Sequence, residues 1–171
     1  MTTRILGIGS PAAGDDRVGL DVLEKLRRFS WPADTELLAV GDPARIISLL
    51  AGADTVILVD AVVGIRAGEV RHLDAASLAR EHLFPVSTHG LGVAQALELA
   101  RRLAPGDMPQ HLDIIGIGIE RAEPGAQSLS RPVAAAVPCA VAWVRAIARA
   151  RSTANPADPT GLPQPVPDTI P

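Results

Sequence analysis

Cysteine, aromatic residues and long uncharged stretches are scarce in this sequence of 171 residues. Cys139 is the only cysteine, so no internal disulfide can form and no cysteine-rich zinc site can be built. With two Trp, two Phe and no Tyr, the chain has few side chains on which bases could stack, which argues against single-stranded nucleic-acid binding. No uncharged stretch of about 20 residues is present to cross a bilayer, and the N-terminus lacks the basic and apolar regions of a signal peptide. We therefore expect a soluble, cytoplasmic protein that binds no membrane.

The charge and the hydrophobic content point to one globular domain. The formal net charge is −3, and arginines alternate with carboxylates, which argues against a nucleic-acid partner and favours a protein or a small molecule. Hydrophobic residues make up 47% of the chain, enough for one core, and we place the domain at residues 1–151 and expect it to be monomeric. Residues 152–171 hold six prolines and almost no large apolar side chains, which predicts a disordered tail.

Short, β-branched-rich runs that suit strands buried on both faces alternate with helical periodicities along the domain, which predicts an open α/β sandwich around a parallel sheet. Val18, Val22, Leu26 and Phe29 recur at helical spacing and predict the first helix. The remaining elements are predicted as strands at 4–9, 35–40, 55–61 and 111–119, an antiparallel or edge strand at 67–75, and helices at 43–50, 92–103 and 131–149.

Three polar residues follow predicted strands or precede a predicted helix: Asp16, Asp60 and His89. Open α/β sheets bind ligands beyond the C-terminal ends of their strands, so these residues are the best candidate site. Each has a structural alternative: Asp15 or Asp16 could cap the following helix, and we expect that role for one of them. Asp60 directly follows an apolar run, where a carboxylate is costly to bury unless a cation or several donors meet it. His89 alone would more often be a packed or capping histidine.

Two carboxylates and one imidazole suit zinc, manganese, nickel or iron and leave positions open for water or substrate, so metal-dependent hydrolysis is feasible. A nucleophilic serine is less favoured, because Ser10 lies in no G-x-S-x-G elbow. Cys139 lies in a predicted amphipathic helix and is expected in the core. The other histidines, which belong to no cluster, are assigned structural roles: His72, His82 and His111.

A nucleotide-binding loop is the alternative from another functional class. Gly7, Gly9 and Ala12 match a variant of the dinucleotide fingerprint. In that fingerprint the helix begins almost at the glycines, whereas here the intervening residues bring two carboxylates, Asp15 and Asp16, which would repel a phosphate.

Six sequence motifs follow one another between residues 4 and 150: ILGIGSPAAGDDRVGLDVLEKL, DTVILVDAVVG, AGEV, STHGLGVAQALELA, LDIIGIGIE and SLSRPV. Together they resemble the NiFe-hydrogenase maturation endopeptidases. The resemblance implies an α/β three-layer sandwich of the phosphorylase/hydrolase-like kind, with a mostly parallel, twisted sheet flanked by helices. It also implies a metal-dependent endopeptidase that removes the C-terminal extension of the hydrogenase large-subunit precursor after nickel insertion. By motif, the family's metal-contacting residues correspond to Asp16, Asp60 and His89.

The resemblance further implies that nickel is supplied by the precursor and that no organic cofactor is needed. The flexible loop would then present Asp16 to the metal, while its glycines let the backbone approach the partner chain. The sequence departs from the family at residues 41–44, where many relatives have a D-G-G-T element and this chain has GDPA. Gly41 occupies the expected aspartate position. Asp42 substitutes from one residue later, or the chain belongs to a subgroup with a different cleavage-site preference.

Overall fold

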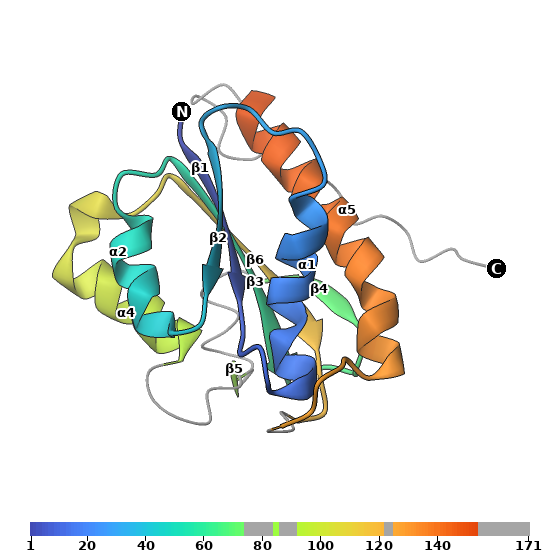
Figure 1. The fold of residues 1–171 in the computed structure, drawn as a ribbon. Coiled ribbons are helices and arrows are strands. Elements are labelled where there is room, and N and C mark those ends of the chain that lie inside the picture. The colour runs from blue at the N-terminus through green and yellow to red at the C-terminus, as the bar shows by residue number, and fades with distance from the viewer. Residues whose placement is uncertain (74–83, 86–91, 122–124, 154–171) are drawn as a thin grey trace.

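The computed structural model describes residues 1–73, 84–85, 92–121 and 125–153, which form a six-stranded, mostly parallel sheet with helices on both faces (Figure 1). The sheet has the order β2-β1-β3-β6-β4, and β5 pairs with the end of β3. Strands β1, β2, β3 and β6 are parallel, whereas β4 and β5 are antiparallel to their neighbours. The predicted α/β sandwich is therefore confirmed. The strands are β1 Thr3–Ile8, β2 Thr35–Val40, β3 Thr55–Val63, β4 Val70–Leu73, β5 Phe84–Pro85 and β6 His111–Gly118.

Burial along the strands follows from their place in the sheet. The central strand β3 is buried at every position except its last, because helices cover both of its faces. β2 was predicted as a strand buried on both faces, and this was wrong: it is an edge strand in which only Val40 is fully buried. β4 is the antiparallel edge strand that the sequence predicted.

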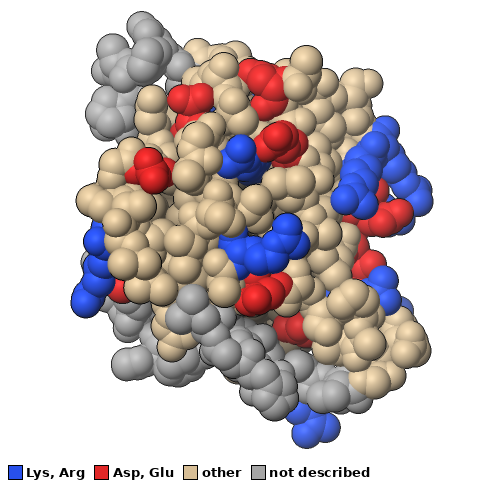
Figure 2. Space-filling model, turned by 60° about the vertical axis from the view of Figure 1, so that its left-hand side comes forward, with Lys and Arg blue, Asp and Glu red and all other residues tan. Residues whose placement is uncertain are grey.

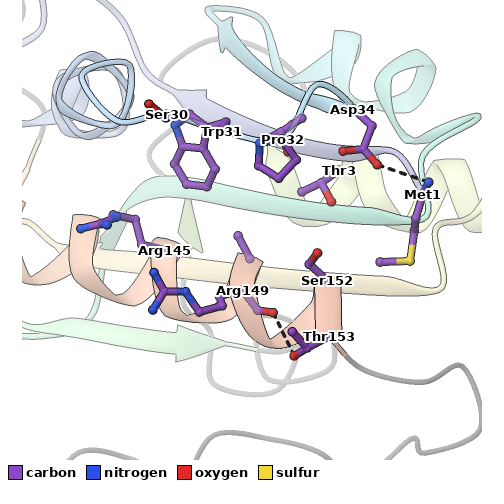
Figure 3. Close-up of a pocket in the computed structure, with 12 residues that line it drawn as sticks. Met1, Thr3, Ser30, Trp31, Pro32, Asp34, Arg145, Arg149, Ser152 and Thr153 are labelled. Atoms are coloured by element: carbon purple, nitrogen blue, oxygen red, sulfur yellow. Dashed lines mark hydrogen bonds and ion pairs between the residues drawn. The ribbon is translucent and has the colours of Figure 1, made fainter.

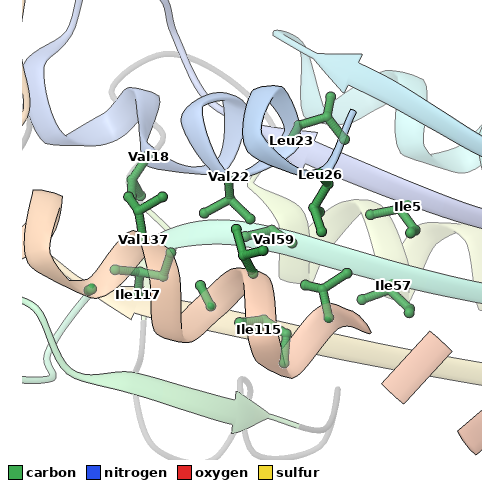
Figure 4. Packing of buried hydrophobic residues seen from close by; sticks show 14 of the residues in the cluster. Ile5, Val18, Val22, Leu23, Leu26, Ile57, Val59, Ile115, Ile117 and Val137 are labelled. Atoms are coloured by element: carbon green, nitrogen blue, oxygen red, sulfur yellow. The ribbon is translucent and has the colours of Figure 1, made fainter. Parts of the chain in front are cut away.

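One face of the sheet is covered by α1 (Val18–Leu26) and α5 (Arg131–Thr153). Val18, Val22 and Leu26 of α1 pack against the sheet, and Figure 4 shows them facing Val59 of β3 and Val137 of α5. These positions are three or four residues apart, so they share one side of the helix. Phe29, which the periodicity placed in the same helix, lies beyond its end and is partly exposed, with the guanidinium of Arg145 3.9 Å from the centre of its ring.

The other face is covered by α2 (Ile46–Leu50) and α4 (Val93–Leu103), which lie side by side (Figure 1). Their buried residues pack against alternate residues of β3, including Val56 and Leu58. Because side chains along a strand point to opposite faces in turn, Asp60 is directed to this same face. The short helical turns are η1 (Gly14–Arg17), η2 (Pro43–Arg45) and η3 (Pro105–Asp107).

The N-terminal turn of α1 lies against the sheet backbone with no room for a side chain between them. A Cβ atom on Gly19 would collide with the carbonyl oxygens of Ile8 and Val59, and one on Gly9 would collide with the carbonyl oxygen of Asp16. Gly9 also has a φ of 150°, which side chains rarely allow. These glycines therefore bring α1 close to the sheet within the chain.

Helix α5 runs to Thr153, four residues beyond the predicted end. Its buried stripe includes Val133, Val137, Ala140 and Val144. Cys139 was predicted to be in the core, but it is exposed. It precedes Ala140 by one position and is therefore turned about 100° away from it, outside the buried stripe.

Among the described helices, α5 alone is long and apolar enough by length and composition to cross a membrane. Its apolar side is occupied by the sheet and α1, so it is the core helix of this domain. On the face shown in Figure 2, basic and acidic side chains lie next to one another and do not gather into a patch of one sign.

Candidate active site

Asp60 is a buried carboxylate in the central strand. Its exposed fraction is 6%, and among the described residues its only hydrogen bond is from the backbone N–H of Ala61, at 2.9 Å from Oδ1. Burial and the negative charge of Asp16 raise the pKa of Asp60 to about 7, against the smaller opposing effect of the Ala61 hydrogen bond. The sequence predicts that this strand ends at residue 61, whereas β3 continues to Val63 because it keeps β6 and β5 as partners after β1 has ended.

Asp16 lies in η1, in the loop between β1 and α1. Its Oδ2 accepts a hydrogen bond from the backbone N–H of Ser10 at 3.1 Å. The side chain is half-buried, and burial raises its pKa, although the Ser10 hydrogen bond opposes this change. Asp16 and Asp60 therefore form a pair of carboxylates close enough to repel one another at the C-terminal edge of the sheet.

This pair fits a cation chemically. Two carboxylates that are partly desolvated and repel one another are stabilised when a positive ion lies between them, and carboxylate oxygen is a suitable ligand for divalent metals. Within the described part of the chain, no three His, Cys, Asp or Glu side chains are grouped closely enough to hold a metal ion. His89, the predicted third member of the site, lies outside the described residues, as does His82.

The two adjacent aspartates have different environments. Neither Asp15 nor Asp16 caps α1, which has no side-chain cap, so the expected capping role is wrong. Asp15 instead accepts a hydrogen bond at 2.6 Å from the backbone N–H of Ser130, the residue before α5. The sequence could not predict this contact, because the two residues are 115 positions apart.

Asp42 lies at the same edge of the sheet, after β2, and its side chain has a local role. Its Oδ1 accepts a hydrogen bond from the backbone N–H of Ala44 at 2.9 Å, which caps η2. An aspartate followed by proline at the first helical position is typical of such a cap. Gly41 precedes it without a carboxylate, so the GDPA segment offers one exposed carboxylate that is already hydrogen-bonded.

A second buried carboxylate, Asp113 at the start of β6, has a structural role. Its exposed fraction is 2%, and it accepts hydrogen bonds from Arg151 at 3.0 Å and pairs with His72 at 2.9 Å. Burial alone would raise the pKa of Asp113, but the hydrogen bonds and charges of His72 and Arg151 lower it overall. The sequence assigned His72 a structural role, and this partner explains it.

A pocket of about 320 Å³ lies at the opposite edge of the sheet, between α5 and the residues before β1 and β2 (Figure 3). Trp31, Arg145 and Arg149 line it, together with Met1 and Asp34, which form an ion pair. None of the candidate site residues lines this pocket, so it is separate from the carboxylate pair.

Comparison with known proteins gives a family match. Residues 20–147 match the sequence model of the HycI family, described as hydrogenase maturation protease. This range includes Asp60 and begins just after Asp16. No curated protein matches the chain closely enough to be counted as a relative.

Solved structures of the same kind superimpose on the chain. The hydrogenase maturating endopeptidase HybD from E. coli is 26% identical, with a TM-score of 0.74, over 90% of this chain and 94% of that one. An endopeptidase from Escherichia coli solved in solution is 27% identical, with a TM-score of 0.76, over the same shares. The [NiFe] hydrogenase maturation protease HybD from Thermococcus kodakarensis shares the fold, at 23% identity and a TM-score of 0.65, over 86% of this chain and 99% of that one.

These matches decide between the two functional classes that the sequence allowed. The loop with Gly7, Gly9 and Ala12 places a pair of acidic side chains before α1, and Gly9 packs against the chain's own backbone where a nucleotide fingerprint would leave space for a pyrophosphate. The family match covers most of the domain and includes the strand of Asp60. The chain belongs to the hydrogenase maturation protease family.

Proposed function

We propose that this protein is an endopeptidase that removes the C-terminal extension from a NiFe-hydrogenase large-subunit precursor after nickel has been inserted, and that it recognises the nickel in that substrate. Family membership supports the reaction. The observation that supports nickel recognition is the pair formed by Asp16 and Asp60, whose mutual repulsion and burial favour a cation between them.

In this proposal nickel belongs to the substrate. Asp16 and Asp60 supply oxygen ligands, and His89, just ahead of α4 in the sequence, supplies a nitrogen ligand. Three ligands of mixed type are enough to complete a coordination sphere that another protein has already begun. The carboxylate of Asp60 is ionised only in part near neutral pH, so a nearby cation also favours its charged form. No organic cofactor is required.

The site also implies where the precursor docks. The β1–α1 loop and the turn with Asp42 follow neighbouring parallel strands, so they lie at one edge of the sheet. We propose that this edge is the contact face for the precursor and that the protease acts as a cytoplasmic monomer, without a nucleic-acid or membrane partner.

The decisive experiment compares precursors with and without nickel. Purified protein is incubated with matched apo and nickel-loaded large-subunit precursor, and loss of the C-terminal extension is followed by mass spectrometry. Cleavage of the nickel-loaded form alone is the expected result. Equal cleavage of both forms would contradict nickel recognition, and cleavage of neither form would contradict the assigned reaction.

The site residues are tested in the same assay. Asp16→Asn, Asp60→Asn and His89→Ala should each abolish or sharply reduce cleavage while the protein stays folded, because site carboxylates contribute to function rather than to core packing. Asp107→Asn is the matched control, since Asp107 is an exposed carboxylate just before β6, at the other edge of the sheet. Full processing by the Asp60 and His89 variants would refute the site assignment.

A further inference from the structure

The loop that contains Asp16 is hydrogen-bonded to the segment just before α5. Two backbone hydrogen bonds join them: the N–H of Gly125 donates to the carbonyl of Ala12 at 2.8 Å, and the N–H of Gly14 donates to the carbonyl of Ala126 at 3.1 Å. Gly14 is buried and has a φ of 57°, a conformation that glycine adopts without strain. The two segments are more than 100 residues apart in the sequence and lie at the same end of the sheet (Figure 1).

Two charged side chains on either side of Asp16 extend this connection. Asp15 accepts the hydrogen bond from the N–H of Ser130 at 2.6 Å, immediately before α5.

Arg17 joins three parts of the chain through one guanidinium group. Its Nε and Nη2 donate to the carboxylate of Asp21 in α1 at 3.1 and 3.0 Å. Its Nη1 donates to the carbonyl of Gln127 at 3.2 Å and to that of Pro11 at 3.4 Å. The planar, forked guanidinium makes these contacts together, which a lysine ammonium cannot do in the same geometry.

The three consecutive residues Asp15, Asp16 and Arg17 therefore have different partners. Asp15 and Arg17 have partners in the segment 125–130, whereas Asp16 interacts with Ser10 of its own loop and with the charge of Asp60. We propose that Asp15 and Arg17 are positioning residues, which bind the β1–α1 loop to the segment before α5 and so hold Asp16 beside Asp60. This role rests on the proposed function above, because it assigns the placement of Asp16 to residues that do not touch the substrate metal.

The test depends on the difference between a hydrogen-bond acceptor and a charge. Asp15→Asn keeps an oxygen that can accept from Ser130, whereas Asp15→Ala removes it. Asp15→Ala and Arg17→Met should each lower kcat/KM for the nickel-loaded precursor about tenfold, and Asp15→Asn should restore it to within about twofold of the wild type. Arg102→Met is the control, since it removes an exposed ion pair with Glu98 in α4 and should change nothing.

Hydrogen exchange on the full chain gives a second readout that does not depend on cleavage. Asp15→Ala and Arg17→Met should accelerate exchange of the amides of Gly14 and Gly125, while Asp15→Asn and Arg102→Met leave them as in the wild type. Unchanged exchange in Asp15→Ala and Arg17→Met would overturn the proposed connection. Faster exchange with unchanged kcat/KM would overturn the positioning role.

A third outcome, in which Asp15→Asn loses as much activity as Asp15→Ala, would show that Asp15 acts through its charge and would also overturn the proposal. Failure of the proposed function is distinguishable from all of these results. In that case the wild-type chain itself does not cleave the nickel-loaded precursor, and the exchange measurement alone decides whether the connection exists.

Discussion

Replacing Asp60 by asparagine should stabilise the folded protein while it abolishes processing. The side chain keeps its shape and loses its charge, which in the wild type is buried in the centre of the sheet. Burial and Asp16 raise the pKa of Asp60 from an ordinary 3.8 to about 7. The folded state therefore keeps a proton on this group at pH values where the unfolded chain has released it, and ionising the group in the folded state is unfavourable.

The sign and size of the effect follow from the two pKa values. Below pH 3.8 the group is protonated in both states and has no effect on the pH dependence. Between pH 3.8 and 7 the wild-type free energy of unfolding falls, relative to that of the variant, by about 1.4 kcal/mol per pH unit. Above pH 7 this accumulated fall stays constant at about 4 kcal/mol. Between pH 5 and pH 8 the advantage of Asp60→Asn should therefore grow by about 3 kcal/mol.

Urea unfolding of both proteins at several pH values from 5 to 8 measures this difference directly. Contributions from titrating groups that do not interact with Asp60 are common to both proteins and cancel in the comparison. Asp107→Asn, at an exposed carboxylate, is the matched control. If the free energies of unfolding of the wild type and Asp60→Asn differ by the same amount at every pH in this range, the argument that burial of Asp60 destabilises the fold is refuted.

Three further predictions follow from the same structure. Asp16→Asn should lower the pKa of Asp60, because a repelling charge is removed, and a carboxyl carbon NMR titration of Asp60 measures this; an unchanged pKa would contradict the pairing of the two carboxylates. Removing residues 154–171 should leave the Tm and the cleavage rate as in the full chain, since the tail has little apolar surface to bury, and a large fall in Tm would show that the tail docks. Arg151→Met should cost about 3 kcal/mol of unfolding free energy by leaving Asp113 buried with one partner fewer, and a loss below about 1 kcal/mol would contradict a structural role for this pair.

The sheet could be predicted from local sequence, because each buried strand is a short, β-branched run between turn residues. The strand lengths were less predictable. The apolar run predicts a strand over 55–61, yet β3 continues to Val63 because two neighbouring strands still pair with it. Cys139 was misplaced for a similar reason: its neighbours in the sequence are apolar, and only the phase of the helix shows which side they cover.

The sequence also indicates the candidate site only in part. A carboxylate after an apolar strand has few structural explanations, so Asp60 could be found from the sequence alone. Asp15 and Asp16 could not be told apart, because both are adjacent acidic residues before a helix. Their difference comes from Ser130 and Asp60, which are distant in sequence and reach the loop only after the chain has folded.

The place of β6 in the sheet determines when the sheet can be completed during synthesis of the chain. β6 is the last strand along the chain, yet it lies between β3 and β4, and β4 has no other partner in the described sheet. An emerging chain can pair β1, β2 and β3 early, but β4 must wait until residue 118 has left the ribosome, and α5 can cover the sheet only later still. Because long-range pairing of this kind slows folding, a nascent chain leaves one edge of β3 and the whole of β4 without their partner until β6 has been made.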